Sequence, residues 1–243
     1  MRKYIPDAIT SMNLLCGILG VILALKGAVA PAFILMILAA VFDFLDGLAA
    51  RLLNACSGLG KELDSLADLV SFGVLPSVML FETMFKSTRS WFIFIPLLIA
   101  IMSAFRLAKF NLDTRQGESF LGLPTPASAM ICGSLAYFAA VHPSSLLAQW
   151  CSGPVLIPAL AVILSILLVS EIPMFSMKFH SHGKEDYSTG IRRTAFLCIT
   201  ACIAITITVM RLNWSLAVLT TFIVYILMNL AFAVIPSTRR QES

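Results

Sequence analysis

The stretch Val41–Asp68, VFDFLDGLAARLLNACSGLGKELDSLAD, places four aspartates between one long apolar run and the next. Asp43 and Asp46 are three residues apart, and Asp64 and Asp68 are four apart. Because helical residues three or four apart share a face, each pair is predicted to lie on one face of its helix. The glycine-containing connection lets the two helices return antiparallel. The four carboxylates are therefore expected to face one another.

The composition predicts an all-α integral membrane protein. Of the 243 residues, 59% are hydrophobic and 12% are charged, and the mean hydropathy is +0.92. Soluble domains are only about 45–50% apolar. Stretches of about 17–25 apolar residues can cross a bilayer. The sequence predicts about eight such helices, near residues 11–27, 29–52, 62–85, 91–110, 124–141, 153–170, 193–210 and 214–235.

The distribution of basic residues predicts the orientation. With a cytoplasmic N-terminus, the far side holds only four of the 17 Lys and Arg residues, namely Lys26, Lys86, Arg89 and Arg211. Cytoplasmic segments carry the excess of basic residues, so both termini and the aspartates are predicted to be cytoplasmic. The net charge of +4 then indicates attraction for anionic lipid rather than binding of nucleic acid.

Four carboxylates converging near a membrane require a countercharge. Burying one unpaired charge is costly, and like charges add repulsion. One or two divalent cations would supply the missing charge. Oxygen ligands favour Mg²⁺ or Mn²⁺ over Zn²⁺.

The aspartates belong to a longer pattern, D-x2-D-G-x2-A-R-x8-G-x3-D-x3-D, from Asp43 to Asp68. This pattern resembles the signature of the CDP-alcohol phosphotransferase family. The resemblance implies a six-helix catalytic core, usually dimeric, in which two divalent metals face the diphosphate of a CDP-linked substrate. The whole chain, 1–243, is then a single membrane-embedded catalytic domain in which the last two helices, about 193–235, are accessory.

The resemblance also implies roles for individual residues. The metal ligands would be Asp43, Asp46, Asp64 and Asp68, and Asp68 would also be the general base. The residues expected to bind CDP-diacylglycerol are Thr10, Asn13, Gly47, Ala50, Arg51, Gly60 and Lys109. Gly47 and Ala50 would make room for the cytidine, and Arg51 would lie near phosphate.

Other segments resemble the serine-specific branch of the family, the membrane-integrated phosphatidylserine synthases of bacteria and archaea. These segments are IPDAITSMNLLCG at Ile5–Gly17, SAFRLAKFN at Ser103–Asn111, FLGLPTPASA at Phe120–Ala129 and SEIPMFSMKF at Ser170–Phe179. Asp7 departs from the Asn that is usual in the first segment. Arg106 is suited to grip the carboxylate of serine through two parallel hydrogen bonds, and Asn111 is assigned to the same pocket.

The expected reaction transfers the phosphatidyl group of CDP-diacylglycerol to L-serine at the cell (inner) membrane, giving phosphatidylserine and CMP. One alternative keeps this chemistry with another acceptor, such as glycerol 3-phosphate. A second alternative is a cation-coupled transporter, which would place polar residues on paths to both faces. A prenyltransferase would also use metal-bridging aspartates, but such enzymes normally carry two acid motifs far apart in sequence.

Overall fold

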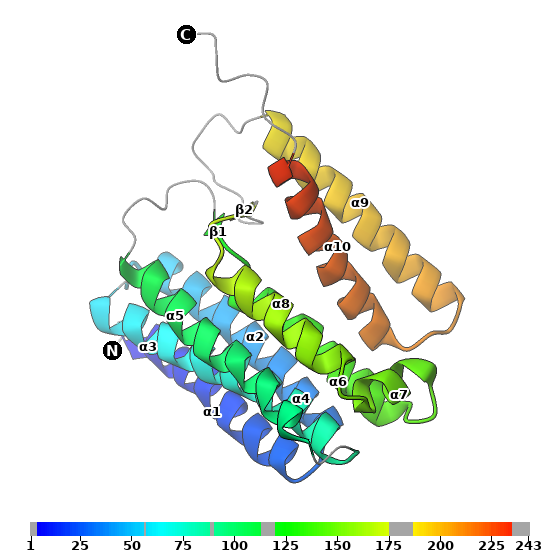
Figure 1. Ribbon diagram of the computed structural model, residues 1–243. Coiled ribbons are helices and arrows are strands. Elements are labelled where there is room, and N and C mark those ends of the chain that lie inside the picture. The colour runs from blue at the N-terminus through cyan, green and yellow to red at the C-terminus, as the bar shows by residue number, and fades with distance from the viewer. Residues whose placement is uncertain (1–3, 56, 88–89, 113–119, 175–186, 235–243) are drawn as a thin grey trace.

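Figure 1 shows the protein as a computed structural model that describes residues 4–55, 57–87, 90–112, 120–174 and 187–234. Almost all of these residues are helical, as predicted. The longer helices are α1 (Ile5–Leu25), α2 (Val29–Leu52), α3 (Gly58–Asp68), α4 (Leu75–Phe85), α5 (Leu98–Leu112), α6 (Thr125–Val141), α8 (Leu156–Val169), α9 (Tyr187–Val209) and α10 (Trp214–Val234). The shorter elements are a π-helical turn (Leu69–Val74), a 3-10 helix (Trp91–Leu97), α7 (Leu146–Ser152), β1 (Phe120–Leu121) and β2 (Pro173–Met174).

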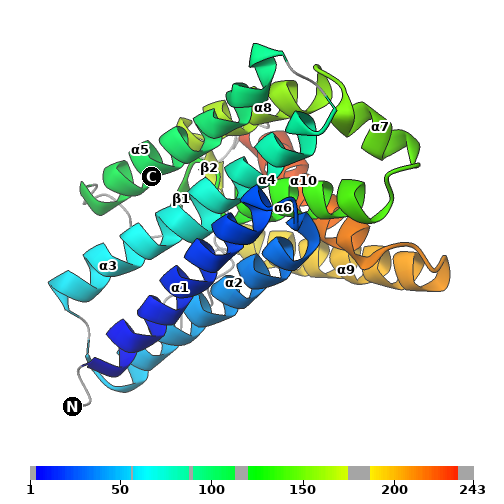
Figure 2. The same ribbon diagram turned by 90° about the horizontal axis from the view of Figure 1, so that it is seen from below.

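Helices α1 to α8 form one bundle, and the α9–α10 hairpin lies along one side of it (Figures 1 and 2). α10 packs against α6, and α9 packs against α10. The strands β1 and β2 form a short antiparallel pair in which Phe120 is opposite Met174. This pair joins the segment before α6 to the segment after α8.

Each predicted apolar segment is helical where it is described, but the expected count of eight spans is not confirmed. By length and composition, five helices among the described residues can cross a membrane, or up to six if the bent pair α6 and α7 is one span. α8 and the apolar part of α9 at Phe196–Val209 are shorter than the spans that the sequence predicted. The first helix also begins at Ile5 rather than at residue 11, because Pro6 is well suited to a first helical turn.

The buried face of α1 is lined by small and polar residues. They recur three or four positions apart and are Pro6, Thr10, Asn13, Gly17, Gly20 and Ala24. A Cβ on Gly17 would lie 3.1 Å from both the backbone nitrogen and the Cα of Ser71, so only glycine allows this approach without a shift. α1 therefore lies directly against the helix that carries Asp64 and Asp68, as Figure 2 shows.

A π-helical turn follows Asp68 without a break. The N–H of Leu75 reaches the carbonyl oxygen of Val70, and the next residue, Pro76, has no N–H to donate. α3, the π-turn and α4 together form one span, Gly58–Phe85. Turns of this kind are frequent at functional sites, and the sequence analysis did not predict this one.

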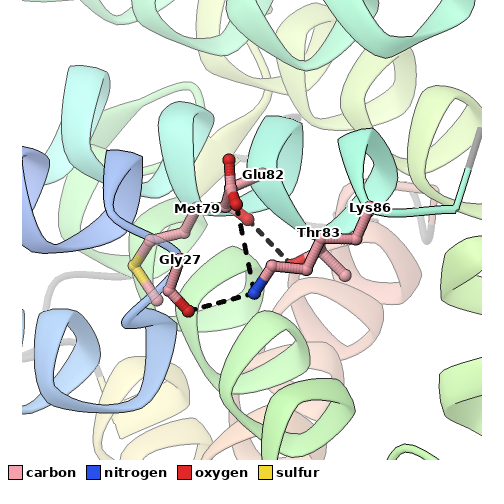
Figure 3. A network of polar contacts seen from close by, with 5 residues as sticks. All are labelled: Gly27, Met79, Glu82, Thr83 and Lys86. Atoms are coloured by element: carbon pink, nitrogen blue, oxygen red, sulfur yellow. Dashed lines mark hydrogen bonds and ion pairs between the residues drawn. The ribbon is translucent and has the colours of Figure 1, made fainter. Parts of the chain in front are cut away.

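At the end of the bundle away from the aspartates, Lys86 at the end of α4 joins α4 to the turn between α1 and α2 (Figure 3). Its Nζ donates to the carbonyl oxygen of Gly27 at 3.0 Å and lies 3.9 Å from Oε1 of Glu82. Gly27 has a φ of +77°, a conformation that favours glycine, and it makes the turn between α1 and α2. Between this end and the aspartates the core contains fully buried Phe33 and Met79. The interior between the two ends is therefore mainly apolar, and its buried polar side chains are uncharged.

We expect Gly17→Val to destabilise the protein by forcing α1 away from Ser71. Overpacking costs about 1–3 kcal/mol, and each kcal/mol is worth about 2–4 °C in a chain of this size. The apparent melting temperature in detergent should therefore fall by about 2–12 °C. Ala8→Val, which adds volume on the exposed face of the same helix, is the control. Equal melting temperatures for the two variants would contradict the close packing at Gly17.

Candidate active site

Three of the four predicted aspartates converge. Asp43 on α2 and Asp64 and Asp68 on α3 each present a carboxylate oxygen, and these oxygens all lie within 4.8 Å of one another. The spacing of four residues places the α3 pair on one helix face. Ser57 begins this helix by accepting a hydrogen bond from the N–H of Gly60 at 2.9 Å. The structure thus brings the two acid pairs together across the connection between α2 and α3.

Asp46 lies outside this group of three but close to it. It is 5% exposed, and its Oδ2 has no hydrogen-bond partner among the residues that the structure describes. Its charge is near enough to that of Asp68 for the two to repel. Thr10 donates to the carbonyl oxygen of Pro6 at 3.0 Å, and its hydroxyl also lies within reach of the Asp46 carboxylate. Asp46 therefore sits between α1 and α2 with a buried oxygen available for a ligand.

Asn13 positions Asp68 from α1. It is fully buried, and its Nδ2 donates to Oδ1 of Asp68 at 3.3 Å. The hydroxyl of Ser71, in the π-helical turn, donates to the carbonyl oxygen of Asn13 at 3.1 Å. Because the turn places Ser71 against α1, it fixes the helix that orients the Asp68 carboxylate.

The other signature residues divide into two environments. A Cβ on Gly47 would have Arg51 Nη2 as its nearest neighbour, at 4.0 Å, so the space in front of Gly47 is open. Arg51 Nε donates to the carbonyl oxygen of Gly47 at 2.9 Å, and Ala50 is half-buried beside them. At Gly60, by contrast, a Cβ would meet Oδ1 of Asp7 at 3.0 Å. Gly60 therefore faces close packing with α1 rather than open space.

Arg106 is buried near the aspartates. It is 9% exposed on α5, and Asp68 is close enough to interact with its charge. Its Nη1 donates to the hydroxyl of Thr125, at the start of α6, at 2.6 Å. Its Nε is buried and has no hydrogen-bond partner among the described residues. A guanidinium has five N–H donors, so this cation can still receive an anionic ligand.

The remaining two predicted residues have other partners. Lys109 Nζ forms an ion pair with Oε1 of Glu171 at 2.9 Å. Asn111 Nδ2 donates to Ser65 Oγ at 3.0 Å and to Glu62 Oε2 at 3.3 Å, so it joins α5 to α3. The structure therefore does not bring Asn111 into contact with Arg106.

Comparison with known proteins identifies the family. Residues 3–169 match the family described as CDP-alcohol phosphatidyltransferase. The chain belongs to this family. The resemblance indicated by the pattern from Asp43 to Asp68 is thereby confirmed.

Individual relatives carry names from the serine branch of the family. A Bacillus subtilis (strain 168) protein named CDP-diacylglycerol–serine O-phosphatidyltransferase is 34% identical over 188 residues, which are 77% of this chain and 98% of the relative. A Mycobacterium leprae (strain TN) protein of the same name is 36% identical over 72% of this chain and 59% of the relative. An archaetidylserine synthase of Methanothermobacter thermautotrophicus is 37% identical over 54% of this chain and 56% of the relative. The chain thus spans nearly all of the first relative and little more than half of the other two.

The carboxylate site fits the divalent metal that the family implies. Three carboxylates lie within reach of one ion, and the buried oxygen of Asp46 is next to them. Hard oxygen ligands of this kind suit Mg²⁺ or Mn²⁺. Without a cation, the three carboxylates would only repel one another.

The sequence analysis assigned no role to several residues around the site. Thr125, which binds Arg106, lies in the quoted segment FLGLPTPASA, and its place between two prolines at a helix start was the available signal. Ser71 reaches Asn13 from the π-helical turn, and Glu171 reaches Lys109 from a loop. Local sequence patterns do not specify either the turn or the loop. Residues 175–179 of SEIPMFSMKF lie outside the described residues.

We expect Asp64→Asn to weaken binding of Mn²⁺ at least about tenfold, by analogy with the loss that perturbing a metal site usually causes. Without metal, the variant should melt no lower than the wild type, because one of three repelling charges is removed. Thermal unfolding during a Mn²⁺ titration measures both effects.

Glu82→Gln is the matched control for this titration, because Glu82 lies at the opposite end of the bundle. Its titration midpoint should equal that of the wild type. An unchanged midpoint for Asp64→Asn would rule out a metal at this cluster.

Proposed function

We propose that this protein transfers the phosphatidyl group of CDP-diacylglycerol to the hydroxyl of L-serine, giving phosphatidylserine and CMP. The serine oxygen bonds to the lipid-side phosphorus, the bond from that phosphorus to the bridging oxygen breaks, and CMP leaves with that oxygen. The carrying observation is a carboxylate cluster next to a buried arginine that has an unused donor. The family match and the names of the relatives support the same reaction.

Asp43, Asp46, Asp64 and Asp68 would hold the divalent cations, either Mg²⁺ or Mn²⁺ and two in number. When bound, these ions neutralise the diphosphate and stabilise the charge that develops during transfer. Asp46 contributes the oxygen that is buried without a hydrogen-bond partner. The protein holds these acids in place through α1, α2 and α3.

Asp68 takes the proton from the serine hydroxyl as the bond to phosphorus forms. A general base must be within hydrogen-bond reach of the proton that it removes. Asn13 holds one carboxylate oxygen of Asp68 at 3.3 Å and so restricts its orientation. Asp68 also lies near Arg106, which supports a base between the donor and acceptor sides.

The donor lies over α2. The open space at Gly47, with Ala50 half-buried beside it, takes the cytidine, and Arg51 lies near the diphosphate. Thr10, Asn13 and Gly60 serve the donor indirectly by placing α1 against the acids. Lys109 holds the lipid phosphate by exchanging its partner Glu171.

The acceptor carboxylate binds Arg106. A zwitterionic amino acid needs one such cation, whereas glycerol 3-phosphate is a dianion and needs a more basic pocket. Two other cations at this end are not available to the acceptor, since Lys109 is assigned to the lipid phosphate and Lys61 donates to the carbonyl oxygen of Asn111 at 3.5 Å. These contacts favour serine over the dianion. Asn111, which contacts α3, acts by positioning α5.

An apolar interior separates the aspartates from the opposite face, which favours an enzyme over a transporter. The bundle core includes Phe33, Met36, Phe72 and Met79, all fully buried. An ion crossing the bundle would lose its hydration there without meeting a charged side chain, since the buried charged residues that the structure describes, Asp46 and Arg106, lie at the aspartate end. The acids therefore serve chemistry at one face.

The membrane proposed for this protein is the cell (inner) membrane, with both termini and the aspartates on the cytoplasmic side. α1 begins beside Gly60, at the aspartate end of the bundle. α10 runs along α6 from Trp214, whose ring centroid lies 5.0 Å from that of Tyr137, to an end near the β1–β2 pair (Figure 1), so it ends on the same side. The basic residues favour placing this side in the cytoplasm. A homodimer, implied by the family resemblance, stays a prediction.

The first test is CMP release from CDP-diacylglycerol by the purified protein with Mn²⁺ or Mg²⁺, with serine, glycerol 3-phosphate and inositol phosphate offered separately. We expect release with serine alone, abolished by a chelator. Asp68→Asn should lower kcat by about 10²–10⁴, the usual contribution of a general base. Release with another alcohol but not with serine would overturn the acceptor assignment.

We expect Arg106→Lys to raise the KM for serine about tenfold, since the charge remains but the two parallel hydrogen bonds to a carboxylate are lost. The KM for CDP-diacylglycerol should stay the same. Lys86→Arg, at the opposite end of the bundle, is the control and should change neither value. A larger increase in the KM for CDP-diacylglycerol than in the KM for serine would place Arg106 on the donor side instead.

A further inference from the structure

The guanidinium of Arg106 is anchored at one nitrogen by Thr125. Thr125 is fully buried at the start of α6, and its hydroxyl accepts a hydrogen bond from Nη1 at 2.6 Å. Nε of the same guanidinium is buried without a hydrogen-bond partner among the residues that the structure describes. The arginine is therefore held through one nitrogen, while another can still donate to a ligand.

A guanidinium presents two edges to a carboxylate, and the anchor at Nη1 makes them unequal. One edge pairs Nε with Nη2, and the other pairs Nη1 with Nη2. A carboxylate at the second edge would share Nη1 with Thr125. At the first edge it would bind the nitrogen that the fold leaves unpaired. Because a buried donor without a partner is costly, binding at the first edge restores more free energy.

The backbone holds Thr125 in place on both sides. Before it, the N–H of Gly122 donates to the carbonyl oxygen of Ile172 at 3.0 Å, and the N–H of Leu123 donates to that of Leu167 at 2.9 Å. After it, a proline in the first turn restricts the start of α6. Its β-branched side chain is also restricted in χ1. The hydroxyl therefore has a defined position toward which Nη1 must point.

We propose that Thr125 is a positioning residue, which fixes the guanidinium of Arg106 so that its Nε–Nη2 edge binds the carboxylate of the acceptor. This inference rests on the proposed function, since it requires an acceptor that carries a carboxylate. Phe110, whose ring centroid lies 6.0 Å from the guanidinium carbon, limits the same group from another side. Thr125 is neutral, so it orients the cation without cancelling its charge.

The experiment compares the wild type with Thr125→Val, Thr125→Ala and Thr125→Ser in the full-length protein in detergent. The first two variants remove the hydroxyl, without and with a loss of volume, and the third keeps it. Thr83→Val, on α4 at the opposite end of the bundle, is the matched control, because it removes a hydroxyl that donates to the carbonyl oxygen of Met79 at 2.8 Å. CMP release is measured as a function of serine at saturating CDP-diacylglycerol, and then with the two substrates exchanged.

We expect Thr125→Val and Thr125→Ala to raise the KM for serine about three- to tenfold, the worth of one hydrogen bond. Their kcat and their KM for CDP-diacylglycerol should match those of the wild type, and Thr125→Ser and Thr83→Val should match in every value. A purely structural role would move both KM values together. That result, an unchanged KM for serine without the hydroxyl, or an equal loss in Thr125→Ser would overturn the proposal.

A double variant tests whether Thr125 acts through Arg106. A lysine has no planar edge to orient, so adding Thr125→Val to Arg106→Lys should leave the KM for serine as it is in Arg106→Lys alone. Effects that multiply would show that Thr125 acts independently and would overturn the proposal. Wild-type activity with serine tests the proposed function separately. Its absence would overturn that function, whereas its presence with an unchanged KM in Thr125→Val would overturn this inference alone.

Discussion

Repulsion among carboxylates held within 4.8 Å of one another is the interaction on which the rest of this structure depends. Two helices must carry the acids and a third must hold those helices together, because nothing in the cluster itself attracts. α1 does this with a face of small residues that lets it lie against the α3 segment, and with Asn13, which donates to Asp68. The packing of the N-terminal helices therefore holds the carboxylates in the arrangement that a cation would stabilise.

The same constraint explains why the bundle differs at its two ends. At one end, Asp46 Oδ2 and Arg106 Nε are buried without a hydrogen-bond partner among the described residues, and each can bind a ligand. At the other end, Lys86 and Glu82 satisfy each other and the turn at Gly27 (Figure 3). A charged group that is buried without a partner costs more stability than a neutral one, so Asp46 and Arg106 mark where binding restores what folding left unpaired.

The sequence predicted what depends on local spacing and composition. The facing acid pairs and the all-α membrane fold followed from helical periodicity and hydropathy, and the aspartate pattern indicated the family. Other features depended on tertiary contacts. The π-turn after Asp68 shifts the helical register. The ion pair of Lys109 with Glu171 and the hydrogen bond of Arg106 to Thr125 join residues that are distant in sequence. Helix length also limited the prediction, because α8 is apolar throughout yet shorter than the span expected.

The position of Arg106 connects the two halves of the proposed reaction. Its charge lies near Asp68, and its side chain lies beside Phe110 of α5 and donates to Thr125 of α6. A zwitterionic acceptor adds no net charge to this region, whereas a dianion would add two negative charges beside the aspartates. Coulomb repulsion at such short range is strong when water is excluded. With a single arginine and neutral neighbours, this region suits an acceptor that has no net charge. Such an acceptor approaches the aspartates without adding to the repulsion among their carboxylates.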